Sequence, residues 1–195
     1  KHDNRDSPIQ ASQGHYFDFT FEQVFGEFEY SRFELEYRKY WLLAERADGS
    51  GRQTISYSTQ VGFSGEDTPI FENFFAGGPQ TVRGYKAYSL GPRDSQGDPI
   101  GGNLKMVGNL ELLFPPPGLE LEKTVRMAAF FDIGQVFDTT KEEYDFKTSE
   151  FRYSAGLGAS WLSPVGALTF SFALPINEKE GDETEEFQFT FGTTF

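Results

Sequence analysis

Apolar and polar residues alternate with a period of two through most of this chain, and this alternation constrains the fold more than any other feature. The final segment, FQFTFGTTF, places phenylalanine at positions 187, 189, 191 and 195, with small or polar residues between them. Successive side chains of a β-strand point to opposite faces of a sheet, so the segment predicts a strand with one apolar face. Similar alternation occurs in segments 16–25, 27–41, 54–63, 101–114, 125–134, 151–161 and 167–174.

One of these segments does not keep a single phase. In EFEYSRFELEYRKYW, the apolar positions change from even numbers (Phe28 and Tyr30) to odd numbers (Phe33 and Leu35) near Ser31. A β-bulge shifts the phase of a strand in this way. A strand boundary placed too early would have the same effect, and the sequence leaves both explanations open.

The length of the segments distinguishes two kinds of sheet. A soluble β-sandwich also has alternating strands, but soluble strands have about 5–6 residues. The segments here have about 10 residues, the length that a tilted strand needs to cross a membrane. Their polar faces carry glycine, serine and isolated charges, which suit a water-filled interior. We therefore expect an all-β fold, an antiparallel transmembrane β-barrel with about eight strands in this chain.

Composition excludes several functional classes. Aromatic residues make up 17% of the chain, which argues against disorder. The chain has no cysteine and only two histidines, so we expect no disulfide, metal site or cofactor. The net charge of -13 argues against a nucleic-acid partner. We find no nucleophile–base pair and no phosphate-binding loop, so we expect no enzymatic activity and no catalytic residue.

The connections between segments alternate in length. Membrane barrels have short periplasmic turns and longer external loops, so the SPVG turn and the C-terminus should be periplasmic. The short connection near Gly26 is an exception, because it should be external. The longest connection, at about residues 64–102, is rich in aromatic residues. Loops of this length are usually functional or disordered, and we expect this one to fold back into the barrel interior.

Within that loop, the stretch FENFFAGGPQTVRGYKAYSLGPRD resembles the sixth external loop of BamA-type outer-membrane assembly factors, with the family motif at Val82, Arg83, Gly84 and Tyr85. FFDIGQVFD, SAGLGASWLSPVGAL and FQFTFGTTF resemble the same family. The resemblance extends from about Asp3 to Phe195. It implies that residues 1–195 are the second half of a 16-stranded barrel, without its POTRA domains and first eight strands.

The resemblance also implies a position for the motif arginine. The family places it inside the barrel, against acidic residues on the wall, which match Glu111 and Asp132 here. Alternation alone already assigns both residues to the polar, inward face. An arginine can hold a carboxylate through two parallel hydrogen bonds, which would fix the loop to the wall. The alternative is that Arg83 lies in a solvated loop, where ion pairs contribute little.

The function implied by the resemblance is insertion of β-barrel proteins into the outer membrane of a Gram-negative bacterium, without ATP. The partners would be unfolded barrel clients, the lipid bilayer and accessory lipoproteins bound mainly through the POTRA domains. A lateral seam would open beside the last strand, whose relevant residues are Phe187, Phe189, Phe191, Gly192 and the terminal Phe195. The C-terminal aromatic residue, with alternate aromatics before it, also resembles the signal that assembly machinery reads on its own clients. Gly192 would let that strand bend, or would only relieve crowding.

Two alternative functions, and the arrangement of the eight strands, remain open. A translocation barrel of the TamA or two-partner secretion type would share the motif, and a passive porin or structural barrel would share the alternation. Eight strands would also leave two unpaired edges in lipid, which is not tolerated. This piece would therefore close as a small barrel, form a homodimer or lie beside another chain.

Overall fold

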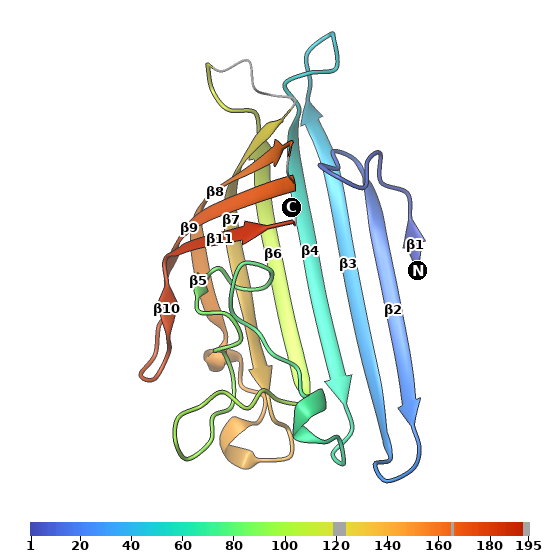
Figure 1. Cartoon of the computed structure of the whole chain (residues 1–195), viewed down its shortest axis with the longest axis vertical. Helices are drawn as coiled ribbons and strands as arrows, with labels where there is room; N and C mark the ends of the chain where they lie inside the picture. Colours follow the sequence, from blue (N-terminus) through green and yellow to red (C-terminus); the bar gives the residue numbers. More distant parts are fainter. Residues whose placement is uncertain (119–123, 165, 193–195) are drawn as a thin grey trace.

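A computed structural model describes residues 1–118, 124–164 and 166–192. The described chain forms one curved antiparallel sheet with the strand order β1-β2-β3-β4-β6-β7-β8-β9-β11 (Figure 1). Eight of these strands correspond to the alternating segments, and β1 adds a two-residue edge. The strands are β1 (His2–Asp3), β2 (Gly14–Val24), β3 (Tyr30–Ala44), β4 (Gln53–Ser64), β6 (Leu104–Phe114), β7 (Val125–Phe137), β8 (Arg152–Ser163), β9 (Gly166–Pro175) and β11 (Phe187–Phe191).

The phase change near Ser31 comes from the strand boundary. Strand β3 begins at Tyr30, and its pairing with β2 runs without interruption from Tyr40 to Tyr30. Phe28 therefore lies in the turn before the strand. The register does shift in β3, but at its other end, between Leu42 and Ala44.

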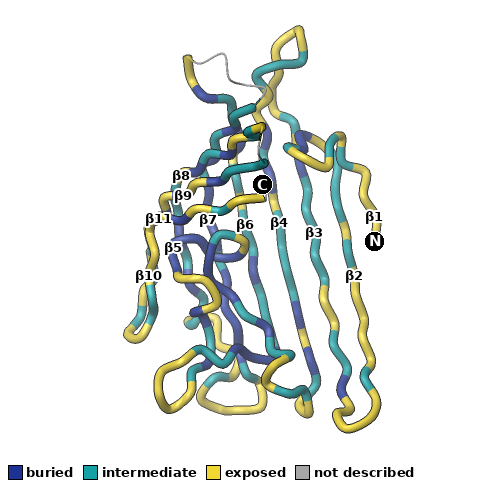
Figure 2. Tube along the Cα trace, in the orientation of Figure 1, coloured by how far each residue is buried: buried dark blue, intermediate teal, exposed yellow. Residues whose placement is uncertain are grey.

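The two faces of the sheet differ as alternation predicts. Outward-facing side chains such as Phe19, Leu110 and Phe172 are about half exposed, whereas inward-facing Asp132 and Ala128 are fully buried. Burial accordingly changes from residue to residue along several strands (Figure 2). Aromatic and aliphatic residues continue across the outer face from β2 to β11. Soluble monomers rarely expose an apolar surface of this extent, and a lipid-facing barrel wall requires one. No helix in the described part of the chain is long and apolar enough to span a membrane.

The ends of the sheet also follow the expected alternation. The loops 65–103 and 138–151 lie at the same end of the sheet, and the short turn between β2 and β3 lies there with them (Figure 1). Residues 45–52 lie at the opposite end. The turn near Gly26 therefore lies on the same side of the membrane as the long loops, the external side expected for it, although it is short. The loop 138–151 contains two short 3-10 helices, η2 (Glu142–Tyr144) and η3 (Thr148–Glu150).

The sheet does not close on itself within the described residues. Its edges are β1 and β11, and these two strands do not pair with each other. Of the three arrangements considered for eight strands, closure as a small barrel is therefore not the one found. The long loop (residues 65–103) lies on the concave side of the open sheet (Figure 1). It contains η1 (Ile70–Glu72) and β5 (Gly84–Tyr85), and β5 pairs with β10 (Thr184–Glu185) in a separate two-stranded sheet.

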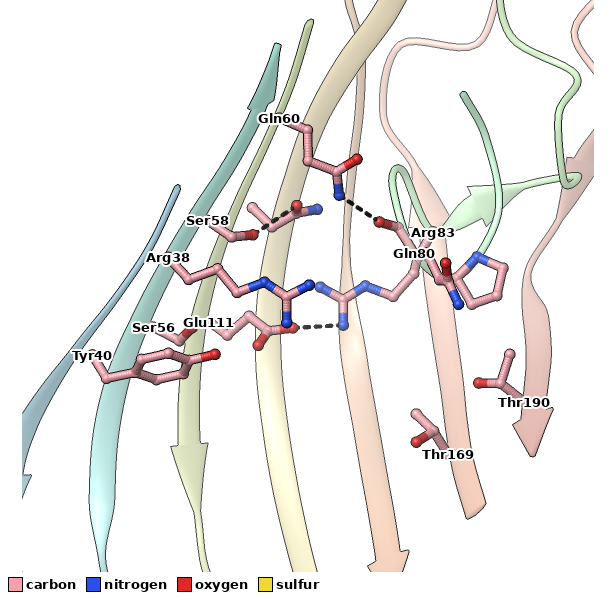
Figure 3. Close-up of a pocket in the computed structure, with 12 residues that line it drawn as sticks. Arg38, Tyr40, Ser56, Ser58, Gln60, Gln80, Arg83, Glu111, Thr169 and Thr190 are labelled. Atoms are coloured by element: carbon pink, nitrogen blue, oxygen red, sulfur yellow. Dashed lines mark hydrogen bonds and ion pairs between the residues drawn. The ribbon is translucent and has the colours of Figure 1, made fainter. Parts of the chain in front are cut away.

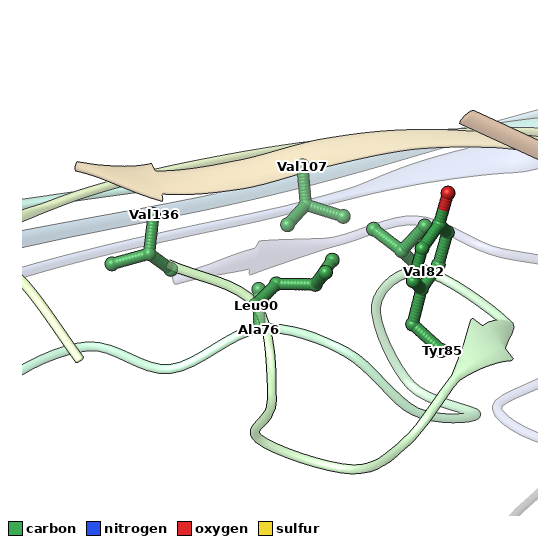
Figure 4. Close-up of a cluster of buried hydrophobic side chains, with 6 residues drawn as sticks. All are labelled: Ala76, Val82, Tyr85, Leu90, Val107 and Val136. Carbon is green, nitrogen blue, oxygen red and sulfur yellow. The ribbon is translucent and has the colours of Figure 1, made fainter. Parts of the chain in front are cut away.

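An apolar cluster joins the long loop to the sheet. Its loop members are Ala76, Val82, Tyr85 and Leu90, and its sheet members are Val107 of β6 and Val136 of β7 (Figure 4). Full burial of a Val or Leu side chain contributes about 1.5–3 kcal/mol. Both valines occupy inward positions, which are mostly polar elsewhere in the sheet. The wall is therefore apolar at the place where the loop packs.

Candidate functional site

Arg83 binds Asp132 through three hydrogen bonds. Its Nε donates to Oδ2 at 2.8 Å, its Nη2 donates to Oδ1 at 2.8 Å, and its backbone N donates to Oδ2 at 3.0 Å. Asp132 is completely buried and Arg83 is 3% exposed. This is the two-pronged geometry in which guanidinium and carboxylate groups bind most strongly. The solvated-loop alternative for Arg83 is therefore not what the structure contains.

A second acid and an aromatic ring complete the surroundings of the guanidinium. Nη1 of Arg83 lies 2.8 Å from Oε1 of Glu111, and Arg38 points toward the same carboxylate (Figure 3). The guanidinium carbon lies 3.5 Å from the ring centroid of Phe130, in cation–π contact. Burial lowers the pKa of Arg83, but the hydrogen bond to Asp132 and the charges of both acids outweigh it and raise the pKa above its ordinary value. Arg83 thus remains charged.

Asn109 links the acid, the loop and a third strand. Its Nδ2 donates to Asp132 Oδ1 at 2.9 Å and to the Thr81 carbonyl at 2.6 Å. Its Oδ1 accepts a hydrogen bond from the Ser58 hydroxyl at 3.1 Å. The side chain therefore orients Asp132 and holds the loop at the residue two positions before the motif arginine.

The other motif residues each have a distinct environment. Val82 is fully buried in the apolar cluster. Gly84 has φ of +88°, and a Cβ added to it would lie 3.2 Å from the Ala173 Cβ of β9. Tyr85 is fully buried, and its hydroxyl donates to the Tyr153 carbonyl at 3.4 Å. Burial, together with the charge of Asp182, raises the pKa of Tyr85 to about 12, so the hydroxyl remains a donor.

The last strand is short and lies at an edge. Strand β11 pairs with β9 over five residues, whereas β8 and β9 pair over ten. Its residues Phe187, Phe189 and Phe191 are exposed on the outer face. Phe195, the terminal member of the expected seam and signal, lies outside the described residues.

Gly192 follows β11 with φ of +90°, and its N–H donates to the Ala167 carbonyl at 2.7 Å. A Cβ added there would meet no atom of the described residues within 4 Å. This left-handed backbone conformation is one that L-residues rarely adopt, which favours glycine at this position.

The chain as a whole has relatives among known proteins. A family model for the Omp85 superfamily domain matches residues 1–195, the whole chain. The chain belongs to the Omp85 superfamily. Within it, the chain is 39% identical over 175 residues to outer membrane protein assembly factor BamA of Neisseria meningitidis, covering 73% of this chain and 22% of the relative. It is 31% identical to BamA of Nitratidesulfovibrio vulgaris, covering 99% of this chain and 24% of that protein.

More distant relatives include a yeast protein and a solved structure. The sorting assembly machinery 50 kDa subunit of Saccharomyces cerevisiae is 26% identical over 99% of this chain and 41% of its own length. A crystal structure of BamA from Haemophilus ducreyi lacking POTRA domains 1-3 matches with a TM-score of 0.86 at 24% identity, over 96% of this chain and 40% of that one. This likeness shows the fold. The chain is thus a BamA-type Omp85 protein that spans about a quarter of the length of its BamA relatives.

Two residues that contact Arg83 or Asp132, Asn109 and Phe130, were not among the partners predicted from the sequence, which were Glu111 and Asp132. Strands β6 and β7 place Asn109 opposite Asp132 and Glu111 opposite Phe130. The four groups around the arginine are thus two cross-strand pairs on one face of neighbouring strands. Alternation places all four residues on the inward face. The register between β6 and β7, if known, would also have identified Asn109 and Phe130 as neighbours of the two acids. No group of three or more His, Cys, Asp or Glu side chains within the described ranges could hold a metal ion.

Alanine at Gly84 is expected to destabilise the docked loop by about 1–2 kcal/mol, because a left-handed backbone disfavours a Cβ by this amount. The contact with Ala173 should add to that cost. Gly97 is a matched control in the same loop, since it also has φ of +88° but has no atom of the described residues within 4 Å of an added Cβ. Thermal unfolding of both variants separates the two effects. Equal losses for Gly84→Ala and Gly97→Ala would show that close packing at Ala173 contributes nothing.

Proposed function

We propose that this chain is the C-terminal part of the barrel of an outer-membrane insertase, which folds β-barrel proteins and inserts them into the membrane. The names of its relatives support this assignment: BamA is an outer membrane protein assembly factor, and the yeast relative is a subunit of a sorting assembly machinery. In this proposal the full-length protein also supplies the first barrel half and POTRA domains. Its clients are unfolded barrel proteins, and accessory lipoproteins bind mainly to the POTRA domains.

The position of β11 at the edge of the sheet is the observation that carries the proposal, because in the full-length barrel this edge would meet the first strand at the seam. The Ala173 N–H donates to the Glu186 carbonyl at 2.8 Å, and the Gly192 N–H donates to the Ala167 carbonyl at 2.7 Å. In an antiparallel pair, every second residue turns its backbone groups toward the same neighbour. Even-numbered residues of β11 therefore bond to β9. The N–H and C=O groups of Phe187, Phe189 and Phe191 point to the open edge.

Such an edge is a template for another strand. An extended segment of a client can add to it through main-chain hydrogen bonds, in the way that peptides extend exposed sheet edges. The side chains of the same three phenylalanines face lipid, so a strand added here is already at the membrane. Burial of the client's apolar face in the bilayer then supplies the free energy, and the proposed activity requires no nucleotide.

The packed long loop favours this function over a passive pore. Arg83 and the apolar cluster hold the loop against the concave wall, where an open porin needs a water-filled channel. Planar-bilayer conductance measurements on the full-length protein address this alternative. A large, steady conductance with no effect on client folding would favour the porin.

The direct test is reconstitution of the full-length protein into liposomes, followed by addition of a urea-unfolded β-barrel client. Folded client is measured by its resistance to protease and its heat-modifiable migration in gels. We expect faster folding than in empty liposomes of the same lipid composition. Equal rates in the two samples would exclude insertase activity.

A further inference from the structure

The motif contacts more of the sheet than its two acids. Gly84 packs on Ala173 of β9, and the Tyr85 hydroxyl reaches the Tyr153 carbonyl of β8. The Tyr85 carbonyl accepts a hydrogen bond from Nε2 of Gln188, in β11, at 2.7 Å. Together with the bonds of Arg83 to β6 and β7, these contacts connect one loop tip to every strand from β6 to β11.

Gln188 makes its bond only in one arrangement of the last strand. It is 3% exposed and lies opposite Ser171 in the pairing of β11 with β9. A shift of the strand by one residue would turn its side chain to the lipid face. Movement of β11 away from β9 would also take the amide out of reach of the Tyr85 carbonyl. The hydrogen bond therefore forms only when the last strand has both this register and this position beside β9.

A second connection lies next to the first. Strand β5 pairs with β10, which ends two residues before β11 begins. Beyond that pair, the Lys86 N–H donates to the Glu183 carbonyl at 2.9 Å, and Lys86 Nζ lies 2.6 Å from the Glu183 carboxylate. Arg93 of the same loop lies 3.2 Å from the other oxygen of that carboxylate. The long loop thus holds both β11 and the segment that leads into it.

The two connections differ in character. Lys86 and Glu183 are both well exposed, and ion pairs of this kind contribute little. The bond from Gln188 is buried, and removing a buried donor leaves an acceptor incompletely satisfied. Gln188 is therefore the stronger candidate for holding the strand in place.

We propose that Gln188 is a positioning residue that holds the last strand, and hence the templating edge, against the motif loop. The Tyr85–Gln188 bond couples the long loop to the edge. When β11 moves to admit a client strand, this bond breaks. This role rests on the proposed insertase function, but the bond itself can be tested without it.

The test uses disulfide formation in the full-length protein in liposomes. These 195 residues contain no cysteine, and Lys86 lies opposite Glu183, so cysteines at these two positions form a reporter pair. Oxidation measures how often the loop and the segment before β11 are adjacent. In this background Gln188→Leu keeps the volume of the side chain and removes the donor. Thr190→Val is the matched control, because Thr190 is the next residue of β11 whose side chain faces inward.

We expect Gln188→Leu to slow disulfide formation about three- to tenfold, the effect of losing one hydrogen bond. Thr190→Val should leave the rate unchanged. Equal rates for the parent and Gln188→Leu would overturn the proposal, and so would equal slowing by both substitutions. Client folding, measured on cysteine-free variants, should change by a similar factor for Gln188→Leu. If the parent does not accelerate client folding, the insertase function fails, while the disulfide rates still decide the role of Gln188.

Discussion

Replacement of Arg83 by alanine is expected to destabilise the docked loop by about 3–5 kcal/mol, because it leaves a buried carboxylate without its partner. Asp132 has no exposed surface, and Arg83 supplies three of its hydrogen bonds. The loss should appear as a lower unfolding temperature of the full-length protein in detergent. Protease should also cut the long loop faster, since the loop is no longer held against the wall.

Three further variants test whether loss of the buried ion pair causes the lower stability of Arg83→Ala. Arg93 belongs to the same loop, pairs with Glu183 and donates hydrogen bonds to the Ser89 and Gly97 carbonyls. These contacts are partly exposed, so Arg93→Ala should cost clearly less than Arg83→Ala. Arg83→Lys keeps the charge but cannot form two parallel bonds, and should lie between the parent and Arg83→Ala. Adding Asp132→Asn to Arg83→Ala should recover part of the stability. If Arg83→Ala is no less stable than Arg93→Ala, the buried ion pair does not hold the loop.

The sheet could be predicted from local sequence because its periodicity is local. Each of the eight strands from the alternating segments shows its lipid-facing side within a short window of sequence, and alternation places Glu111 and Asp132 on the inner face. The boundary of β3 was less certain, because Phe28 continues an apolar pattern into a turn. Because a turn residue such as Phe28 can also be apolar, the apolar pattern alone does not show where a strand begins or ends.

The loop contacts could not be predicted in the same way. Val107 and Val136 depart from the polar inner face, and this departure was an available signal for the place where the loop packs. The bond between Gln188 and Tyr85, by contrast, joins residues 103 positions apart. Its donor looks like any other polar residue on the inner face of a strand. Only the path of the loop through the concave side of the sheet brings the two groups together.

Proline at Phe189 is expected to slow client folding by up to about tenfold relative to Phe189→Ala, while leaving the protein folded. The N–H of Phe189 points to the open edge, and proline is tolerated in an edge strand when its missing donor faces away from the sheet. The variant therefore removes a donor from the middle of the template but keeps the pairing with β9. A main-chain hydrogen bond contributes about 0.5–1.5 kcal/mol, which corresponds to a change of up to about tenfold.

Phe189→Ala is the baseline for this comparison, because it removes the ring and retains the N–H. Thr190→Pro tests the opposite side of the strand: its N–H faces β9, so this variant should lower the unfolding temperature of the barrel. The liposome assay then compares Phe189→Pro with Phe189→Ala. If the two fold the client at the same rate, the odd-numbered backbone groups of β11 are not the template, and the strand acts through its side chains or not at all.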